Sequence, residues 1–444
     1  MIESGYNYYV PNGDKMLCLN GISKIVLSLG NDEYEFMKRL MQTPALQQQY
    51  PDVQQRLARA HFLVDSMESE ITYLRQLHET VTHNGIWHLI INPTQDCNFR
   101  CWYCYEKHPK GHMQPETLER IKKLVRNIFE QHEVKHFMLG WFGGEPLMYF
   151  DEIVHPLSQY VKQLAAEYGA GFSNSMTSNG FLLTQGVRAK CPEISLNHFQ
   201  ITLDGDREAH NRTRNQKGMP SFDQILDNAI ALVEAYPESS IKLRINYNSD
   251  TIQADFAQIL GGIPQDVRSR FWVQFQRIWQ TYEKEGSDTR VKEILQHHFD
   301  ALKKAGFRIS FTSTYNFFRG ILCYADRVNY AHINYDGNVY RCTANDYTAE
   351  NALGYVDDAG NIVWDEAKTN GWADKAFFDN PVCLSCKLLP LCGGPCFNKW
   401  WHNFRNKPLK ECPLKGFKSD MDLETFVREY YDYKTRKSQK GSGD

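Results

Sequence analysis

The chain lacks any long run of apolar residues. In its 444 residues no apolar stretch approaches the roughly 18 residues that a membrane-spanning helix needs. The first residues, Met-Ile-Glu-Ser, lack the basic-then-apolar pattern of a secretory signal. The chain also has no strong excess of either charge, because its formal net charge is −3. We therefore expect a cytoplasmic protein that binds neither nucleic acid nor a membrane.

Cysteine, by contrast, is plentiful. Ten of the twelve cysteines fall into two groups, within residues 97–104 and 323–412. Without a secretion signal, such clustering favours metal or iron–sulfur ligation over disulfides. The length is compatible with about three domains, and the 42% hydrophobic content is enough for a sizeable core.

The first cysteine group has the sequence Cys-Asn-Phe-Arg-Cys-Trp-Tyr-Cys over residues 97–104. Each of its three thiolates can bind one iron of a [4Fe–4S] cluster, which leaves the fourth iron open for a substrate or cofactor. Zinc is a weaker interpretation, because zinc sites usually carry pairs of Cys-x2-Cys and the first spacing here is x3. Three unrelated core cysteines would not be expected so close together.

The spacing Cys-x3-Cys-x2-Cys, with the aromatic Tyr103 before the last cysteine, resembles the radical S-adenosylmethionine (radical SAM) enzymes. The resemblance implies that Cys97, Cys101 and Cys104 hold a [4Fe–4S] cluster whose open iron binds the amino and carboxylate groups of SAM. It also implies reductive cleavage of SAM to a 5′-deoxyadenosyl radical, with the cofactors doing the difficult chemistry. An oxygen-sensitive cluster of this kind implies an anoxic setting.

From residue 86 to about 310, strand-like runs alternate with helical patterns. This alternation predicts a parallel α/β sheet, and the resemblance implies an open (β/α)6 partial TIM barrel. Ligands of such sheets bind at the carboxyl ends of the strands. We predict strands at 86–91, 136–142, 171–177, 199–203, 241–247 and 271–276, and helices near 115–131, 152–168, 183–190, 221–236, 253–260 and 288–305.

Three motifs follow these predicted strands. Gly-Gly-Glu-Pro at 143–146 resembles the motif that contacts the SAM amino group, where close backbone approach favours glycine. Thr-Ser-Asn-Gly at 177–180 resembles a turn near the SAM ribose or carboxylate, although an ordinary Asn-Gly turn remains the alternative. Thr-Leu-Asp-Gly at 202–205, followed by His210 and Arg214, resembles a signature of peptide-modifying members, with Asn211 where Asp is commoner.

Charged and polar residues on these strands complete the predicted SAM site. The guanidinium fork of Arg214 suits the SAM carboxylate. Arg244 and Asn246 alternate on one face of the fifth strand, where they could contact SAM or form a structural ion pair. The predicted cofactor contacts are Tyr103, Gly143, Gly144, Glu145, Pro146, Ser178, Asn179, Asp204, Arg214, Arg244 and Asn246.

The second cysteine group resembles the SPASM domain, a carboxyl-terminal extension of radical SAM enzymes with up to two auxiliary [4Fe–4S] clusters; we place it at residues 311–432. The resemblance assigns one cluster to Cys383, Cys386, Cys392 and Cys412, and the other to Cys323, Cys342 and Cys396. This second cluster would have an open iron or borrow a ligand. Zinc stays an alternative, because Cys-x2-Cys suits it. Cys18 and Cys191 are spare candidates that we expect to be buried thiols.

Residues 1–85 form a separate predicted module. Three strands, at 6–10, 15–19 and 24–29, precede three helices. This order resembles a small winged-helix-like α+β domain that recognises leader peptides, and such a domain can add an extended peptide as an edge strand. A cap that merely packs on the enzyme is the alternative. The polar tail, from 433 to 444, is predicted to be disordered.

Together these features predict a radical SAM maturase that forms thioether, carbon–carbon or ether crosslinks in a ribosomally made precursor peptide. Its cofactors would be SAM and three [4Fe–4S] clusters, and its partners a leader-bearing peptide and an electron donor such as flavodoxin or ferredoxin. One alternative is an anaerobic sulfatase-maturating enzyme, which oxidises Cys or Ser to formylglycine. A second is a non-enzymatic iron–sulfur electron carrier or a zinc-stabilised peptide-binding module.

Overall fold

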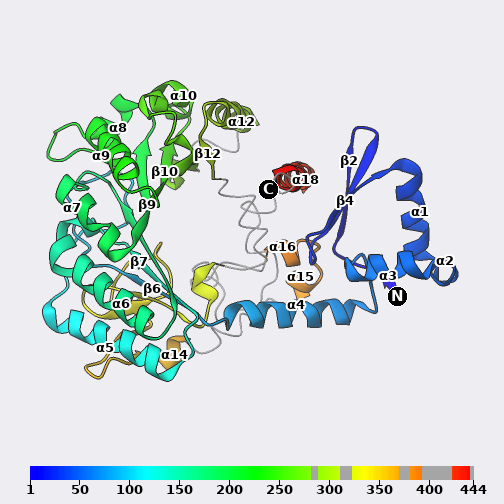
Figure 1. Cartoon of the computed structure of the whole chain (residues 1–444), viewed down its shortest axis with the longest axis horizontal. Coiled ribbons are helices and arrows are strands. Elements are labelled where there is room, and N and C mark those ends of the chain that lie inside the picture. Colours follow the sequence, from blue (N-terminus) through cyan, green and yellow to red (C-terminus); the bar gives the residue numbers. More distant parts are fainter. Residues whose placement is uncertain (282–288, 311–322, 370–380, 393–422, 441–444) are drawn as a thin grey trace. The chain divides into compact units, whose positions relative to one another are not determined.

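The computed structural model describes residues 1–281, 289–310, 323–369, 381–392 and 423–440. The chain divides into two units (Figure 1). We call Gly85–Thr312 with Asn329–Asn370 the sheet unit, and Met1–Asn84 with Ser313–Val328 and Gly371–Asp444 the terminal unit. Within the described residues no helix is both long enough and apolar enough to cross a membrane.

The sheet unit is built on one eleven-stranded sheet in the order β12-β11-β10-β9-β8-β7-β6-β13-β14-β15-β16. Pairing is parallel from β12 through β13 and antiparallel from β13 through β16. The strands are β6 (Ile86–Ile91), β7 (His136–Trp141), β8 (Gly171–Ser178), β9 (Leu196–Asp204), β10 (Ser240–Tyr247), β11 (Phe271–Arg277), β12 (Arg308–Ile309), β13 (Tyr330–Ile333), β14 (Asn338–Tyr340), β15 (Gly354–Val356) and β16 (Ile362–Trp364).

Helices connect the parallel strands and pack on the sheet through apolar faces. In α5 (Pro115–Gln131), Ile121, Leu124, Val125 and Ile128 recur at helical spacing and are buried in the main core. Figure 1 shows the connecting helices around the outer side of the strands. The other helices of the sheet unit are α6 (His155–Glu167), α7 (Gln185–Lys190), α8 (Arg207–Thr213), α9 (Phe222–Ala235), α10 (Phe256–Ile259), α12 (Thr289–Lys304) and α14 (Glu366–Thr369), which follows β16.

The predicted fold class is confirmed: strands and helices alternate as expected, and the strands form a large parallel sheet. The sheet extends further than predicted, because β13 pairs in parallel with β6, beginning where the His88 amide donates to the Asn329 carbonyl at 2.9 Å. No local sequence pattern indicates this pairing, because β13 and β6 are separated by the whole α/β region. β13 and β14 form an antiparallel pair, in which His332 lies opposite Tyr340 and Ile333 opposite Val339.

The terminal unit contains a three-stranded antiparallel sheet of β2 (Asn7–Asn12), β3 (Lys15–Asn20) and β4 (Val26–Gly30). A second, two-stranded sheet pairs β1 (Ile2–Glu3) with β5 (Leu63–Val64). The helices are α1 (Asn31–Gln42), α2 (Pro44–Gln49), α3 (Pro51–Arg59), α4 (Met67–Thr82), α15 (Pro381–Leu384), α16 (Leu389–Cys392) and α18 (Leu423–Lys440).

Alternation along β3 gives the three-stranded sheet two apolar faces. Leu17 and Leu19 are buried with Phe426 and Val427 of α18, whereas Cys18 is buried with Met37 and its neighbours on the first helices. The helix α18 continues to Lys440, so the predicted disorder from residue 433 is wrong as far as that residue. The buried residues of α18, Phe426, Val427 and Tyr430, all precede residue 433, so their packing anchors the first part of this helix.

Candidate active site

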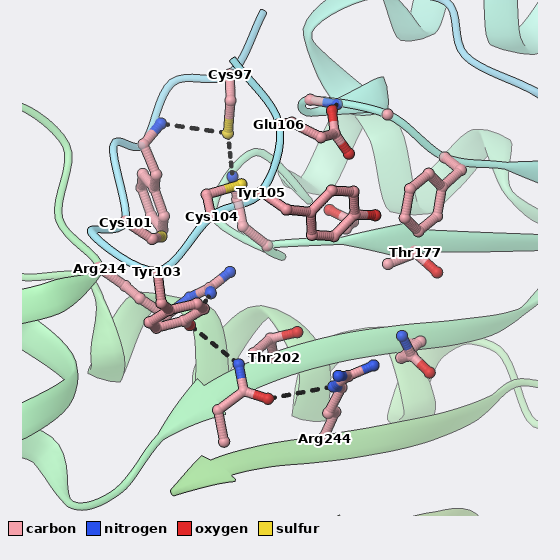
Figure 2. A pocket seen from close by; sticks show the side chains of 18 of the residues that line it. Cys97, Cys101, Tyr103, Cys104, Tyr105, Glu106, Thr177, Thr202, Arg214 and Arg244 are labelled. Carbon is pink, nitrogen blue, oxygen red and sulfur yellow. Dashed lines mark hydrogen bonds between the residues drawn. The ribbon is translucent and has the colours of Figure 1, made fainter. Parts of the chain in front are cut away.

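A cavity of about 190 Å³ lies at the carboxyl ends of β6 to β11 (Figure 2). The loops after β6 and β7 form one wall, and residues of β8 to β11 form the other. Its lining residues are Cys97, Phe99, Cys101, Tyr103, Cys104, Tyr105, Glu106, His108, Phe142, Gly143, Gly144, Thr177, Ser178, Asn179, Gln200, Thr202, Arg214, Arg244, Asn246, Arg277, Ile278 and Trp279. This is the edge at which parallel sheets bind their ligands.

The cysteine loop that follows β6 places Cys97, Cys101 and Cys104 on this cavity. Backbone hydrogen bonds shape the loop, among them the amide of Cys104 to the carbonyl of Cys101 at 3.0 Å. The Sγ of Cys97 accepts from the amide of Phe99 at 3.4 Å. Three soft sulfur donors therefore surround one space, a donor set that suits iron–sulfur chemistry.

Burial makes these thiols poor acids in the absence of a bound ion. Burial raises the pKa of Cys97 to about 12, with Glu145 adding to the effect, and that of Cys104 to about 11. Burial also raises the pKa of Cys101, while the positive charge of Arg214 opposes this rise. Bound iron would hold all three as thiolates, because metal ligation releases the thiol protons.

Metal-donor geometry distinguishes a cluster from a single ion. Among the described residues, no three Cys, His, Asp or Glu side chains converge closely enough to bind one metal ion. A cubane cluster has no need of such convergence, because each thiolate binds a different iron. The three thiols of the cysteine loop fit a [4Fe–4S] cluster in this way, with one iron for each thiolate.

A hydrogen-bonded network joins the cysteine loop to β9 and β10. The Tyr103 hydroxyl donates to Asp204, whose two oxygens lie at 2.8 and 2.7 Å. The same hydroxyl accepts from Arg214 Nη1 at 2.8 Å and from Asn246 Nδ2 at 3.0 Å. Arg244 Nε in turn donates to Asn246 Oδ1 at 3.1 Å, as the dashed lines of Figure 2 show. Three predicted cofactor contacts, Asp204, Arg214 and Asn246, thus meet at Tyr103.

A second set of bonds fixes this network from behind. The amide of Asp204 donates to His210 Nδ1 at 3.2 Å, so the proton of the neutral ring lies on Nε2. His210 Nε2 then donates to Ser221 Oγ at 3.0 Å, and that hydroxyl donates to the carbonyl of Arg214 at 2.6 Å. Burial lowers the pKa of His210 to about 3, which keeps the ring neutral and this order of donors intact.

Asn211 occupies the position where the resembling signature usually has Asp. Its Oδ1 accepts from the amides of Ser221 and Phe222, at 2.9 and 3.0 Å, at the first turn of α9. These are amides that a helix leaves without an internal partner. An amide oxygen serves this purpose as a carboxylate would, which explains why Asn is tolerated here.

The glycines of the Gly-Gly-Glu-Pro motif allow the chain to pass under the cysteine loop. Gly144 has a φ of +30°, and a Cβ there would lie 1.9 Å from the carbonyl oxygen of Asp96. Gly143 has a φ of +78°, and a Cβ there would lie 2.4 Å from the Asn92 side chain. The Gly144 amide donates to Glu106 at 2.8 Å. No residue with a side chain fits at either position without displacing the loop.

Glu145 points into the protein rather than into the cavity. Its carboxylate is fully buried and accepts from the amide of Leu147 at 3.0 Å, the Ser178 hydroxyl at 2.8 Å and the Asn179 amide at 2.7 Å. Burial raises its pKa, and these three donors oppose the rise. Glu145 thus positions the turn after β8, whereas Pro146 is buried and begins a short 3-10 helix.

Of the predicted cofactor contacts, Glu145, Pro146 and Asp204 do not line the cavity, and the others do. Sequence reasoning missed several lining residues, notably Glu106, Thr202, Arg277 and Trp279. Glu106 could have been found, because it follows Cys104 by two residues in the same loop. Burial raises the pKa of Glu106 to about 7.

The second cysteine group is only partly described. Cys396, Cys412 and the side chain of Cys392 lie outside the described residues. Cys383 and Cys386 share one turn, in which the Cys386 amide donates to the Cys383 carbonyl at 3.0 Å. Cys323 and Cys342 belong to different units. Cys18 and Cys191 are buried, and burial raises the pKa of each thiol to about 12.

Comparison with known proteins identifies the domain that carries the cavity. Residues 91–253 match the radical SAM superfamily. The cysteine-type anaerobic sulfatase-maturating enzyme of Clostridium novyi is 24% identical over 366 residues, covering 74% of this chain and 93% of that protein. The GTP 3′,8-cyclase of Campylobacter jejuni subsp. doylei is 26% identical over 41% of this chain and 49% of that protein.

A protein of unknown function from Synechocystis, sll1766, is 30% identical over 138 residues, 29% of this chain and 34% of its own length. The chain thus spans half or less of sll1766 and the cyclase. Among solved structures, native anSMEcpe with bound AdoMet superposes with a TM-score of 0.59 at 20% identity, covering 79% of this chain and 99% of that one. Streptococcus suis SuiB bound to precursor peptide SuiA superposes with a TM-score of 0.50 at 15% identity, covering 93% and 98%. These similarities confirm the fold.

Proposed function

Because residues 91–253 form a radical SAM domain, we propose that this protein is a radical SAM maturase of a ribosomally made precursor peptide. The observation that carries the proposal is the shared cavity of Cys97, Cys101, Cys104 and Arg214. The proposed product is a peptide with thioether, carbon–carbon or ether side-chain crosslinks. The proposed electron donor is a flavodoxin or ferredoxin.

The three cysteines of the loop would hold a [4Fe–4S] cluster, and Arg214 would pair with the SAM carboxylate. When bound, these cofactors supply a 5′-deoxyadenosyl radical that abstracts a hydrogen atom from the peptide. The chain itself keeps the cavity in shape: Gly143 and Gly144 allow close backbone approach, and Tyr103 holds Arg214 in position. Ser178, Asn179, Arg244 and Asn246 line the remaining surface.

Two auxiliary [4Fe–4S] clusters belong to the same proposal. Cys383, Cys386, Cys392 and Cys412 would hold one, and Cys323, Cys342 and Cys396 the other. Support comes from the clustering of seven cysteines in the last third of the chain. Iron and sulfide analysis of the protein purified without oxygen tests this count, since a chain with one cluster would hold a third of the expected iron.

Peptide substrates are supported by two relatives. One solved relative is described as bound to AdoMet and the Kp18Cys peptide, and another as bound to precursor peptide SuiA. The terminal unit supports a leader-guided substrate. Its sheet of β2, β3 and β4 has edge strands, beside which an extended peptide could pair as an additional strand.

The experiment is anaerobic incubation of the reconstituted protein with SAM and dithionite, followed by chromatography of the nucleosides. We expect 5′-deoxyadenosine from the wild-type protein and from Cys191→Ala, whose thiol is buried away from the cavity. Cys97→Ala should form none. If wild-type protein with intact clusters forms no deoxyadenosine, the protein is an electron carrier or a binding module and the proposal is wrong.

A second candidate is a sulfatase-maturating activity, which the match to 93% of the Clostridium novyi enzyme favours. The two activities leave different products. A maturase of crosslinked peptides removes two hydrogen atoms per crosslink and keeps the sulfur of a crosslinked cysteine. A sulfatase-maturating enzyme replaces a cysteine thiol with an aldehyde. Mass spectrometry of a cysteine-containing sulfatase peptide and of a short co-expressed precursor peptide separates the two.

A further inference from the structure

Three arginines line the cavity, and two of them, Arg214 and Arg244, differ in their surroundings. Arg214 lies beside the cysteine loop, with its guanidinium 6.0 Å from the centre of the Phe99 ring and 2.8 Å from the Tyr103 hydroxyl. Its Nη1 is also 3.9 Å from Asp204. SAM has a single carboxylate, and Arg214 is the arginine next to the thiols. A further cation at the same cavity therefore needs another explanation.

Arg277, at the end of β11, and Arg244 are such cations, and Arg244 is the one beside the Tyr103 network. Arg244 projects from β10, and its Nε donates to Asn246 Oδ1 at 3.1 Å. Its two Nη atoms make no hydrogen bond to any described residue, and none of the described carboxylates lies within ion-pair distance of it. Burial lowers its pKa, but a guanidinium stays charged at neutral pH. Asp204 attracts this charge from beyond ion-pair distance, but a largely buried cation without a directly paired anion is costly unless a ligand supplies one.

The carboxylates near Arg244 are already engaged. Asp204 accepts from Tyr103 and lies beside Arg214. Glu106 is held by the amide of Gly144 at 2.8 Å. Glu106 lines the same cavity, but among the described residues neither Glu106 nor Asp204 forms an ion pair with the Nη fork of Arg244. A carboxylate fits such a fork through two parallel hydrogen bonds.

The rim of the cavity suits a peptide. Tyr105 and Trp279 meet edge to face there, with ring centroids 5.7 Å apart, and 52% of the surface of Trp279 is exposed. Exposed aromatic rings of this kind provide large contact area at little entropic cost. A peptide crossing these rings could insert one side chain toward β10, on which Arg244 lies (Figure 2).

We propose that Arg244 binds a carboxylate of the substrate peptide, so that an acidic group close to the modified residue selects the substrate. This inference rests on the proposed function in one respect, the peptide nature of the substrate. The acidic group is either an Asp or Glu side chain or the carboxyl terminus of the peptide. The shared chemistry is a carboxylate on the Nη fork of Arg244.

The test measures peptide binding without turnover. Short fluorescent peptides with randomised flanks are prepared with a central Glu or a central Gln, each as a carboxyl-terminal acid and as an amide. Their affinity for the anaerobic, cluster-loaded, SAM-bound protein is measured by fluorescence anisotropy. The test variant is Arg244→Gln. The control variant is Lys242→Gln, which removes a positive charge from the same strand at a position outside the cavity lining.

We expect the wild-type protein and Lys242→Gln to bind the Glu amide peptides about tenfold more tightly than the Gln amide peptides. Arg244→Gln should abolish that preference. If the wild-type protein instead binds the peptides with a free carboxyl terminus more tightly than the amidated peptides, and Arg244→Gln removes this difference, the carboxyl terminus is the recognised group. Equal binding of all four peptides, or a preference that survives Arg244→Gln, overturns the inference.

Nucleoside analysis of the same variants separates this inference from the proposed function. Lys242→Gln, outside the cavity lining, should form 5′-deoxyadenosine with the KM for SAM of the wild-type protein, and the peptide affinities of Arg244→Gln are compared with the wild type at saturating SAM. A raised KM for SAM in Arg244→Gln without any loss of peptide preference would assign Arg244 to the cofactor and overturn the inference. Failure of the wild-type protein to form deoxyadenosine would overturn the proposed function instead, whatever the peptide affinities.

Discussion

The hydroxyl of Tyr103 lies 2.8 and 2.7 Å from the two carboxylate oxygens of Asp204, although 101 residues separate them. The same hydroxyl accepts from Arg214 and Asn246, so it satisfies three side chains at once. Burial raises the pKa of Asp204, and Arg214 and Tyr103 oppose the rise. Tyr103 is thus the point at which the cysteine loop is tied to β9 and β10.

Tyr103→Phe should weaken this tie without removing the ring. Asp204 and Arg214 would each lose a buried hydrogen bond, which costs about 1–3 kcal/mol of stability. We expect the KM for SAM to rise, because Arg214 loses the bond that orients it, while the cluster content stays the same. Anaerobic kinetics and thermal unfolding measure the two effects.

Tyr160→Phe is the matched control for that experiment. The Tyr160 hydroxyl accepts from Arg126 at 3.2 Å on the helical surface, away from the cavity. Its loss should change stability little, because the bond is exposed to solvent, and should leave the KM for SAM unchanged. An unchanged KM in Tyr103→Phe as well would show that the network does not orient Arg214.

Gly144→Ala should prevent the cysteine loop from forming. The new methyl would lie 1.9 Å from the Asp96 carbonyl oxygen, in a backbone conformation that side chains rarely adopt. We expect little or no iron to be incorporated at the cysteine loop. The cluster absorbance and the iron content should therefore fall by the same amounts as in Cys97→Ala.

Gly169→Ala separates backbone strain from the clash. Gly169 has a φ of +67°, but nothing lies within 4 Å of a Cβ built there. It should cost about 1 kcal/mol of stability and leave the iron content unchanged. Normal iron content in Gly144→Ala would mean that Asp96 can move and that the close approach is not required.

The protonation of His210 should make the protein less stable in acid. Burial lowers its pKa from 6.5 to about 3, so between these values the unfolded chain binds a proton that the folded chain does not. The contribution of His210 to stability is therefore complete above pH 6.5 and is lost progressively as the pH falls toward 3. Between about pH 7.5 and 5.5 this residue alone should cost about 1.4 kcal/mol.

His210→Gln tests that contribution. A glutamine amide can accept from the Asp204 backbone and donate to Ser221, but it does not titrate. Denaturant unfolding at about pH 7.5 and 5.5 should therefore show a smaller loss of stability in the variant than in the wild-type protein. Parallel losses in the two proteins would show that His210 titrates normally and is not held neutral.

The regular elements of the sheet unit were predictable because their signals are local. Alternating burial along β9 and β10 and the helical spacing of apolar residues in α5 are both visible in the sequence. The cysteines and glycines of the cavity were also visible, because their chemistry depends on residue type and spacing.

Features that depend on tertiary contacts were not predictable. The pairing of β13 with β6 joins segments about 240 residues apart, and the bond from Tyr103 to Asp204 spans 101 residues. The helix α18 was missed because its apolar partners lie on β2 and β3. The direction of Glu145 was missed as well, because the motif identifies the residue but not the three donors that turn it inward.

Glu145→Gln should expose that inward role. The carboxylate accepts from three donors, and an amide in its place would direct a donor at one of them. A buried donor left without an acceptor costs about 1–3 kcal/mol, and the turn of Ser178 and Asn179 would shift away from the cavity. We expect a lower melting temperature and a higher KM for SAM.

Glu152→Gln is the control, because Glu152 is exposed. It should behave as the wild-type protein in both measurements. The contrast also decides between two roles for Glu145. If the carboxylate bound the SAM ammonium directly, Glu145→Gln would raise the KM for SAM without lowering the melting temperature of the SAM-free protein. If it holds the turn after β8, Glu145→Gln lowers the melting temperature of the SAM-free protein and also raises the KM for SAM.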